Sequence, residues 1–185
     1  MKQRDYSAGI SGCHYAVRNS IGSLVMNRLP GAVRLTRRPS PEGRNFLVRD
    51  DNGSVYSYAH SPKEKERHYT LEIVSLTKTF LTDVLGYVEN EDGSLTEGIA
   101  GNVHISLFYE TENGGRPVRH RLYDCVVSPP TFDVQTLGET LSADTRKLEL
   151  TANPDPHRDG AYSTQIARAD NAQLFDSWFG LKGQV

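Results

Sequence analysis

Short runs of alternating hydrophobic and polar residues recur along this chain, and such alternation is typical of half-buried β-strands. It is clearest at residues 69–76, where Tyr69, Leu71 and Ile73 fall on one face and polar residues fall on the other. Further strands are predicted at residues 15–17, 32–36, 103–109, 119–127 and 147–152. The chain is therefore expected to be mainly β.

Turn residues separate these runs and predict how neighbouring strands connect. Residues 45–49 and 54–58 flank Asn52-Gly53, a pair that tolerates the positive φ values of a type I′ hairpin turn. Further turns are predicted at residues 29–31, 92–93 and 113–115. Residues 38–67 are too polar for a core and too regular for a linker, so we expect them to form a projecting hairpin arm.

Two segments change to the 3.6-residue period of an amphipathic helix. The first has Thr77 as its N-cap and Gly86 as its C-terminal stop. Its apolar face consists of Leu76, Phe80, Leu81, Val84 and Leu85. The second lies in a C-terminal helical tail at residues 169–185, where Asp170 and Gln173 have the spacing of a capping box. Its apolar face, which Gly180 ends, consists of Leu174, Phe175, Trp178 and Phe179.

The composition is that of one domain with exposed extensions. The chain has 185 residues, of which 37% are hydrophobic and 24% charged, and its formal net charge is -2. A net charge of this sign and size provides no overall basic field to attract nucleic acid. The N-terminal charges precede no apolar run, and no window approaches a membrane span. We therefore expect a soluble protein that stays in the cytoplasm where it is made.

No catalytic or cofactor motif occurs in the sequence, so neither an enzyme nor a cofactor is expected. Cys13 and Cys125 are far apart and are interpreted as reduced packing residues rather than as a disulfide or a metal site. Residues 50–53 and 90–93 resemble calcium loops, but Val48 and Val88 stand where the first ligand would be. Both segments are better interpreted as hairpin turns.

Residues 155–160 form the most metal-like stretch, because Asp155, His157 and Asp159 lie close together. Arg158 lies among them, and a solvated loop is the favoured interpretation, so no metal is expected. A carboxylate pair for hydrolysis is a similarly weak alternative among the acidic residues between 89 and 112.

Charge is segregated along the chain. Residues 34–67 carry eight Lys or Arg against five Asp or Glu, whereas residues 83–115 carry seven Asp or Glu and no Lys or Arg. A basic limb and an acidic limb favour head-to-tail association between copies, because unlike patches attract one another. Ordinary surface charge that happens to segregate is the alternative.

Four groups of short motifs, in order along the chain, resemble the major tail (tail-tube) protein family of long-tailed, siphophage-type bacteriophages. They lie at residues 9–16 with 29–32, at 71–73 with 84–87, at 106–111 with 119–125 and 128–130, and at 175–179. Asp124-Cys125 stands where the family often has a glycine, and residues 154–168 match poorly. These departures concern local loop geometry.

The resemblance implies a single tail-tube domain over residues 1–185, with a β-sandwich or partial barrel and one flanking α-helix. It implies a structural virion protein that is assembled in the host cytoplasm as stacked hexameric rings. These rings form the tail tube through which DNA passes into the host without specific binding. The implied partners are other copies of the chain, a tape measure protein, a tail terminator and distal tail or baseplate proteins. No membrane is involved.

Candidate assembly residues follow from the arm and from the charge pattern. An inter-subunit interface is predicted at Arg37, Arg38, Arg44, Phe46, Tyr56, Tyr58, Arg67 and Trp178. A lumen wall or an acidic ring face is predicted at Asp83, Glu89, Glu91, Glu97, Glu110 and Glu112, because a wall that repels phosphates lets DNA slide.

Two other classes of protein remain open. The first is a tail-terminator or distal-tail ring protein, which would form one ring in each particle. The second is a β-sandwich enzyme or carbohydrate-binding protein, which requires a polar site that the sequence does not display.

Overall fold

A computed structural model of the chain describes residues 9–18, 24–38, 44–49, 55–61, 66–99, 101, 103–131 and 145–180. The first strands are β1 (Ser11–Arg18), β2 (Leu24–Arg28), β3 (Ala32–Arg37), β4 (Arg44–Arg49), β5 (Val55–Ser61) and β6 (Arg67–Ile73). The later strands are β7 (Val88–Glu89), β8 (Leu95–Thr96), β9 (His104–Asn113), β10 (Arg116–Thr131), β11 (Arg146–Asn153) and β12 (Ser163–Ala167). The helices are α1 (Lys78–Asp83), the 3₁₀ turn η1 (Pro156–Arg158), α2 (Ala172–Ser177) and the 3₁₀ turn η2 (Trp178–Gly180).

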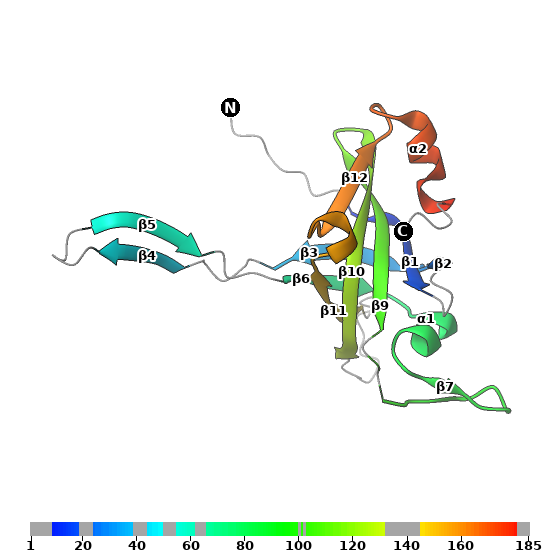
Figure 1. Ribbon diagram of the computed structural model, residues 1–185. Helices are drawn as coiled ribbons and strands as arrows, with labels where there is room; N and C mark the ends of the chain where they lie inside the picture. The colour runs from blue at the N-terminus through cyan, green and yellow to red at the C-terminus, as the bar shows by residue number, and fades with distance from the viewer. Residues whose placement is uncertain are drawn as a thin grey trace, which may run out of the picture.

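One eight-stranded sheet forms the body of the molecule, in the order β2-β1-β9-β10-β11-β6-β3, with β12 paired to β10. Its two terminal strands, β2 and β3, are consecutive in the chain and are joined by residues 29–31 alone. The sheet therefore has to curl so that its two ends approach each other. Figure 1 shows the result, in which β3 and β6 run across the direction of β9 and β10. The mainly β fold class, with a partial barrel, is confirmed.

The long strand β10 makes this curvature possible because it changes partner along its length. It pairs with β12 at Val118–Leu122 and with β11 at Asp124–Thr131, and it pairs with β9 along its other edge. The register with β9 shifts between Leu122 and Cys125. Such an irregularity bends a strand and increases its twist.

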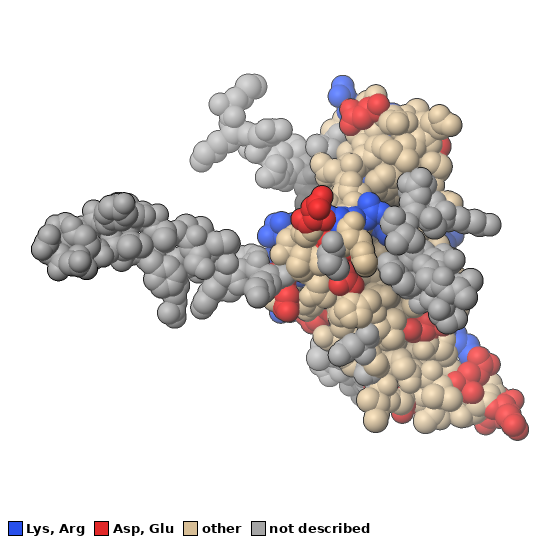
Figure 2. All heavy atoms as spheres, viewed as in Figure 1, with Lys and Arg blue, Asp and Glu red and all other residues tan. Residues whose placement is uncertain are grey.

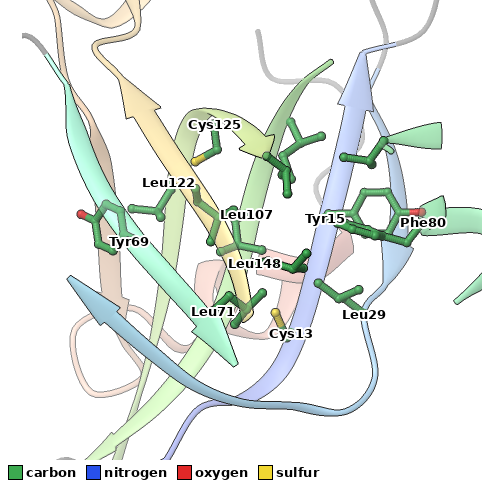
Figure 3. Close-up of a cluster of buried hydrophobic side chains, with 14 of the residues drawn as sticks. Cys13, Tyr15, Leu29, Tyr69, Leu71, Phe80, Leu107, Leu122, Cys125 and Leu148 are labelled. Carbon is green, nitrogen blue, oxygen red and sulfur yellow. The ribbon is translucent and has the colours of Figure 1, made fainter. Parts of the chain in front are cut away.

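The core fills the inside of the curled sheet, as the predicted alternation requires. Tyr69, Leu71 and Ile73 of β6 are buried, and so are the inward residues of β1, β9, β10 and β11 (Figure 3). Cys13 and Cys125 are free thiols in this core, and burial raises the pKa of each to about 12. They act as packing residues in the described structure.

Helix α1 covers one side of the core at the predicted position. The Phe80 amide donates a hydrogen bond to Thr77 Oγ1 at 3.2 Å, and Gly86 has a φ of 77° after the helix. The ring of Phe80 meets the ring of Tyr15 edge-on, with 4.9 Å between centroids. The N-cap and the C-terminal stop that the sequence predicts are both confirmed.

The C-terminal helix packs on the outer face of the sheet. Trp178 is buried there with Ala16 of β1 and Phe108 of β9. The predicted N-cap at Asp170 is wrong by one residue. Asn171 Oδ1 accepts the hydrogen bond from the Leu174 amide at 2.9 Å, and the amides of both Asp170 and Asn171 close a turn on the Ala167 carbonyl before the helix begins.

Two strands of the large sheet, β2 and β12, were not predicted from the sequence, and of the β7–β8 hairpin only the turn was predicted. The strand predicted at residues 69–76 ends earlier in the structure, where the last residue of β6 is Ile73. The predicted hairpin at residues 45–58 is present as the antiparallel pair β4–β5, which Figure 1 shows projecting away from the sheet. Its predicted turn at Asn52-Gly53 lies outside the described residues.

Candidate assembly surfaces

The two ends of the curled sheet are open edges. In the described part of the chain, β2 pairs only with β1, and β3 pairs only with β6. Each edge carries a large exposed hydrophobic residue, Val25 at 47% exposure and Val33 at 46%. An unpaired edge is a template for strand pairing with another chain.

The β4–β5 hairpin carries four of the predicted interface residues, Arg44, Phe46, Tyr56 and Tyr58. The strand register places Phe46 opposite Ala59, and the irregularity between Val48 and Arg49 lies where Tyr56 interrupts the pairing. Among the described residues the hairpin forms a two-stranded sheet of its own. Its contact with a neighbouring subunit stays a prediction.

The predicted interface arginines outside the hairpin are held by their own chain. Arg38 forms an ion pair with Glu149, and its Nε donates to Thr70 Oγ1 at 3.2 Å. The Arg67 guanidinium lies 4.0 Å from the centroid of the Tyr162 ring. Arg37 is exposed at the end of β3. The structure therefore places these three arginines around β3 and β6, and it leaves their role between subunits as a prediction.

Trp178 does not lie on the surface that the sequence predicted for it. It is only 6% exposed, because η2 folds it against the outer face of β1 and β9. Its indole has no hydrogen-bond acceptor among the described residues. The amphipathic pattern around Trp178 thus reflects packing within the chain, and we omit Trp178 from the proposed interface.

A cluster that the sequence did not suggest fastens the C-terminal helix to the sheet. The Arg119 guanidinium lies 4.1 Å from the ring centroid of Phe175 and 4.3 Å from that of Phe179. Its Nε donates to Glu110 Oε2 at 2.8 Å, and Nη1 donates to the Phe175 carbonyl. The imidazole ring of His14 stacks on the ring of Phe179, with 4.8 Å between ring centroids.

No local pattern could have shown this cluster, because its members come from β1, β9, β10 and the C-terminal helix. Glu110, which was predicted on a lumen wall or an acidic ring face, forms an ion pair with Arg119 of the same chain. Its side chain is half-buried.

The six predicted acidic residues do not form one surface. Asp83, Glu89, Glu91 and Glu97 lie between α1 and the segment after β8, where Figure 2 shows acidic side chains gathered at the end that Figure 1 labels β7. Glu110 and Glu112 lie instead near the turn between β9 and β10. Their placement on a lumen wall or a ring face stays a prediction.

The β7–β8 hairpin has a rigid turn. The Asn90 side-chain amide donates to Ser94 Oγ at 2.8 Å and to Thr96 Oγ1 at 2.9 Å. Asp92 Oδ1 accepts from Ser94 Oγ at 2.6 Å, and this hydrogen bond is the main cause that lowers the pKa of Asp92. The segment interpreted as a turn rather than a calcium loop is therefore a turn.

The metal-like stretch at residues 155–160 uses its donors internally. Asp155 Oδ1 accepts from the His157 amide at 3.0 Å, and Asp155 Oδ2 lies 3.6 Å from Arg158 Nε. Within the described ranges, no three His, Cys, Asp or Glu side chains are grouped as metal ligands. Nor does any described helix have the length and hydropathy to cross a membrane.

Comparison with known proteins finds distant structural likenesses. No family model matches the chain, and no curated protein matches it. A chain in the cryo-EM structure of the PVC sheath–tube complex, an extracellular contractile injection system in its extended state, is similar. It shares 13% identity and a TM-score of 0.43, over 89% of this chain and 94% of that chain.

A second similar chain comes from the cap that terminates the tube of the anti-feeding prophage. It shares 10% identity and a TM-score of 0.42, over 90% of this chain and 95% of that chain. Likenesses at this level carry no conclusion about function.

Proposed function

We propose that this chain is a structural subunit of a tail tube of the bacteriophage type, which works by self-assembly and has no enzymatic role. The observation that carries the proposal is the curled, open sheet, whose terminal strands β2 and β3 both have an unpaired outer edge among the described residues. The ordered sequence motifs that resemble the tail-tube family support it.

Closure of the sheet by neighbouring copies follows from the physics of edges. The two ends of the large sheet in a single copy are open to aggregation, whereas a ring in which the β3 edge of one copy meets the β2 edge of the next covers both of these ends. Because the two edges differ, the contact is heterologous, and a suitable rotation closes it into a ring. Hexameric rings that stack along one axis would make a tube.

The remaining parts of the chain have roles in this proposal. The β4–β5 hairpin, with Arg44, Phe46, Tyr56 and Tyr58, reaches the adjacent ring. Arg37, Arg38 and Arg67 lie beside the β3 edge. The group of Asp83, Glu89, Glu91 and Glu97 faces the lumen or one ring face, where it does not retain DNA phosphates. The tube works in the virion tail with a tape measure protein, a terminator and distal tail proteins, and conducts DNA during ejection.

Lysine at an exposed edge position tests the role of the edges. Val25→Lys in β2 and Val33→Lys in β3 change side chains that are nearly half exposed, so each variant should fold normally. A charge on an edge strand opposes strand pairing. Each variant is expected to remain monomeric by sedimentation velocity at concentrations where the unmodified chain forms rings.

The matched control is Leu174→Lys, on α2, where the side chain is 37% exposed and far from either edge in sequence. It should assemble as the unmodified chain does. Normal assembly of both edge variants would contradict pairing through β2 and β3.

A further inference from the structure

The segment from Val88 to Ile99 contains the β7–β8 hairpin, and we call it the acidic hairpin. Several hydrogen bonds and one ion pair hold it in place. Its strands have two residues each, and a two-stranded hairpin is marginal alone. The Asn90 and Asp92 hydrogen bonds hold its turn, and Lys78 Nζ on α1 contacts Glu89 Oε1 at 2.6 Å. A Cβ at Gly98 would lie 2.5 Å from the Gly86 carbonyl oxygen, so the base of the hairpin is closely packed.

The acidic hairpin presents an apolar surface beside its charges. Val88 is 57% exposed and Ile99 is 97% exposed, and both are among the large hydrophobic residues that solvent reaches. Glu91 and Glu97 are exposed beside them, and no Lys or Arg occurs between residues 79 and 115. A rigid, apolar and acidic ribbon is suited to dock on a partner that is apolar and basic, because little ordering entropy is lost on binding.

A complementary surface exists on the same chain, at the end of the sheet where β3, β6 and β11 lie side by side. The register aligns Arg34 with Glu72 and Glu72 with Lys147, so these three side chains lie on the outer face of the sheet. The exposed Val74 follows Ile73 directly. We call Arg34, Val74 and Lys147 the basic patch.

Among the described residues, the charges of the basic patch are not balanced. Two cations border a single carboxylate, Glu72, and no described carboxylate forms an ion pair with Arg34 or Lys147. The patch therefore has an excess of positive charge next to an exposed valine. The positive charge and the exposed valine of the patch are complementary to the carboxylates and the exposed apolar residues of the acidic hairpin.

We infer that the acidic hairpin of one copy docks on the basic patch of another copy. Glu91 and Glu97 meet Arg34 and Lys147, while Val88 and Ile99 cover Val74. The two surfaces differ, so the contact is heterologous and propagates from copy to copy. The inference deepens the proposed function, on which it rests, by naming a contact between copies other than the strand edges.

Charge exchange tests the pairing. A hairpin variant (Glu91→Lys, Glu97→Lys) and a patch variant (Arg34→Glu, Lys147→Glu) should each weaken self-association by about tenfold or more, since like charges then face each other. The combined fourfold variant restores opposite charges and should recover association to near that of the unmodified chain. Sedimentation velocity at matched concentrations measures all four proteins.

The matched control exchanges the charges of the exposed ion pair between Arg168 and Asp176 with Arg168→Glu and Asp176→Lys, which lie outside the two surfaces. It should leave association unchanged. A fourfold variant that stays as weak as the single-surface variants, or a hairpin variant with no defect, overturns the inference.

A second measurement on the unmodified chain avoids any effect of substitutions on folding. Carbodiimide joins a carboxylate to a lysine amine in direct contact, so an assembled mixture of ¹⁴N and ¹⁵N copies should yield cross-links between Lys147 of one copy and Glu91 or Glu97 of another. Their absence from an assembled, cross-linked sample overturns the inference.

The two proposals fail separately. Tubes that form in every charge variant leave the proposed function intact and overturn this docking. Association that is charge-dependent and restored by exchange, but never gives rings or tubes, supports the docking and contradicts the tube.

Discussion

The Arg119 side chain contacts residues of three separate elements, and its role could only be seen in three dimensions. It joins β10 to the C-terminal helix through two aromatic rings, a carbonyl and a carboxylate. A buried ring face attracts a guanidinium, and the Glu110 carboxylate holds that guanidinium in place. The attachment of the C-terminal helix to the sheet therefore depends on the guanidinium group of Arg119.

Arg119→Ala should loosen this helix and reduce the free energy of unfolding by about 2 kcal/mol, from the lost cation–π and charge-assisted contacts. Trp178 is the only tryptophan of the chain, so its fluorescence reports directly on the helix during urea denaturation. The control is Arg168→Ala, whose ion pair with Asp176 is exposed and should contribute less than about 0.5 kcal/mol. Equal effects of the two substitutions would contradict the proposed role of Arg119.

His120 gives stability a defined dependence on pH. It stacks on Tyr109 with 4.7 Å between ring centroids and lies 2.8 Å from Thr111 Oγ1, and burial lowers its pKa below 6.5. The unfolded chain therefore binds the proton more readily. The contribution of neutral His120 is fully present above pH 6.5 and is lost as the pH falls below it.

His120→Gln should consequently lose less stability than the unmodified chain between pH 7.5 and pH 5.5. Urea denaturation at both pH values measures the difference, and His157→Gln, in the exposed turn η1, is the control. If His120→Gln loses as much stability between the two pH values as the unmodified chain does, burial of His120 is not the cause of this pH dependence.

At the scale of single elements, local signals explain which parts of the fold could be predicted. Helix α1 was predicted with its cap because Thr77, the apolar face and Gly86 all lie within one short segment. The strands of the core were predicted because inward and outward residues alternate along them. Each of these signals is contained in the element itself.

The elements that were missed depend on distant partners. Ser163–Ala167 is mostly polar and becomes β12 only because the first half of β10 offers it an edge. Leu24–Arg28 is a short edge strand that β1 defines. The Arg119 cluster and the separation of the acidic residues likewise depend on how strands far apart in sequence align, and no local pattern contains that information.

The cap of α1 provides a test at this scale. Thr77→Ala removes the acceptor of the Phe80 amide and should reduce the free energy of unfolding by about 1 kcal/mol. Thr79→Ala, inside the same helix, removes no cap and replaces a β-branched residue with the best helix former, so it should have little effect or stabilise the fold. Thermal or urea denaturation distinguishes the two, and a larger loss in Thr79→Ala would contradict the assignment of the cap.

At the scale of the whole molecule, a curled sheet with two open edges and a projecting hairpin is poorly explained as an isolated monomer. The double substitution of Phe46 and Tyr56 by serine should leave the fold of the body intact and stop ring stacking, because the β4–β5 hairpin is proposed to reach the adjacent ring. Circular dichroism checks the fold, and particle length in electron micrographs checks the stacking. Tubes of normal length would contradict the role assigned to the hairpin.

Copy number distinguishes the tube from a terminator or distal-tail ring. A tube subunit is present in many rings along each tail, whereas a terminator is present in one. Quantitative mass spectrometry of purified particles should therefore find this chain among the most abundant tail proteins. An abundance equal to one ring would support the alternative.

Electron microscopy of the purified full-length chain, at increasing concentration, tests the central claim most directly. The account predicts rings of uniform diameter that stack into hollow tubes of variable length. A chain that stays monomeric at high concentration, together with tails that contain no tube made from it, would contradict that claim.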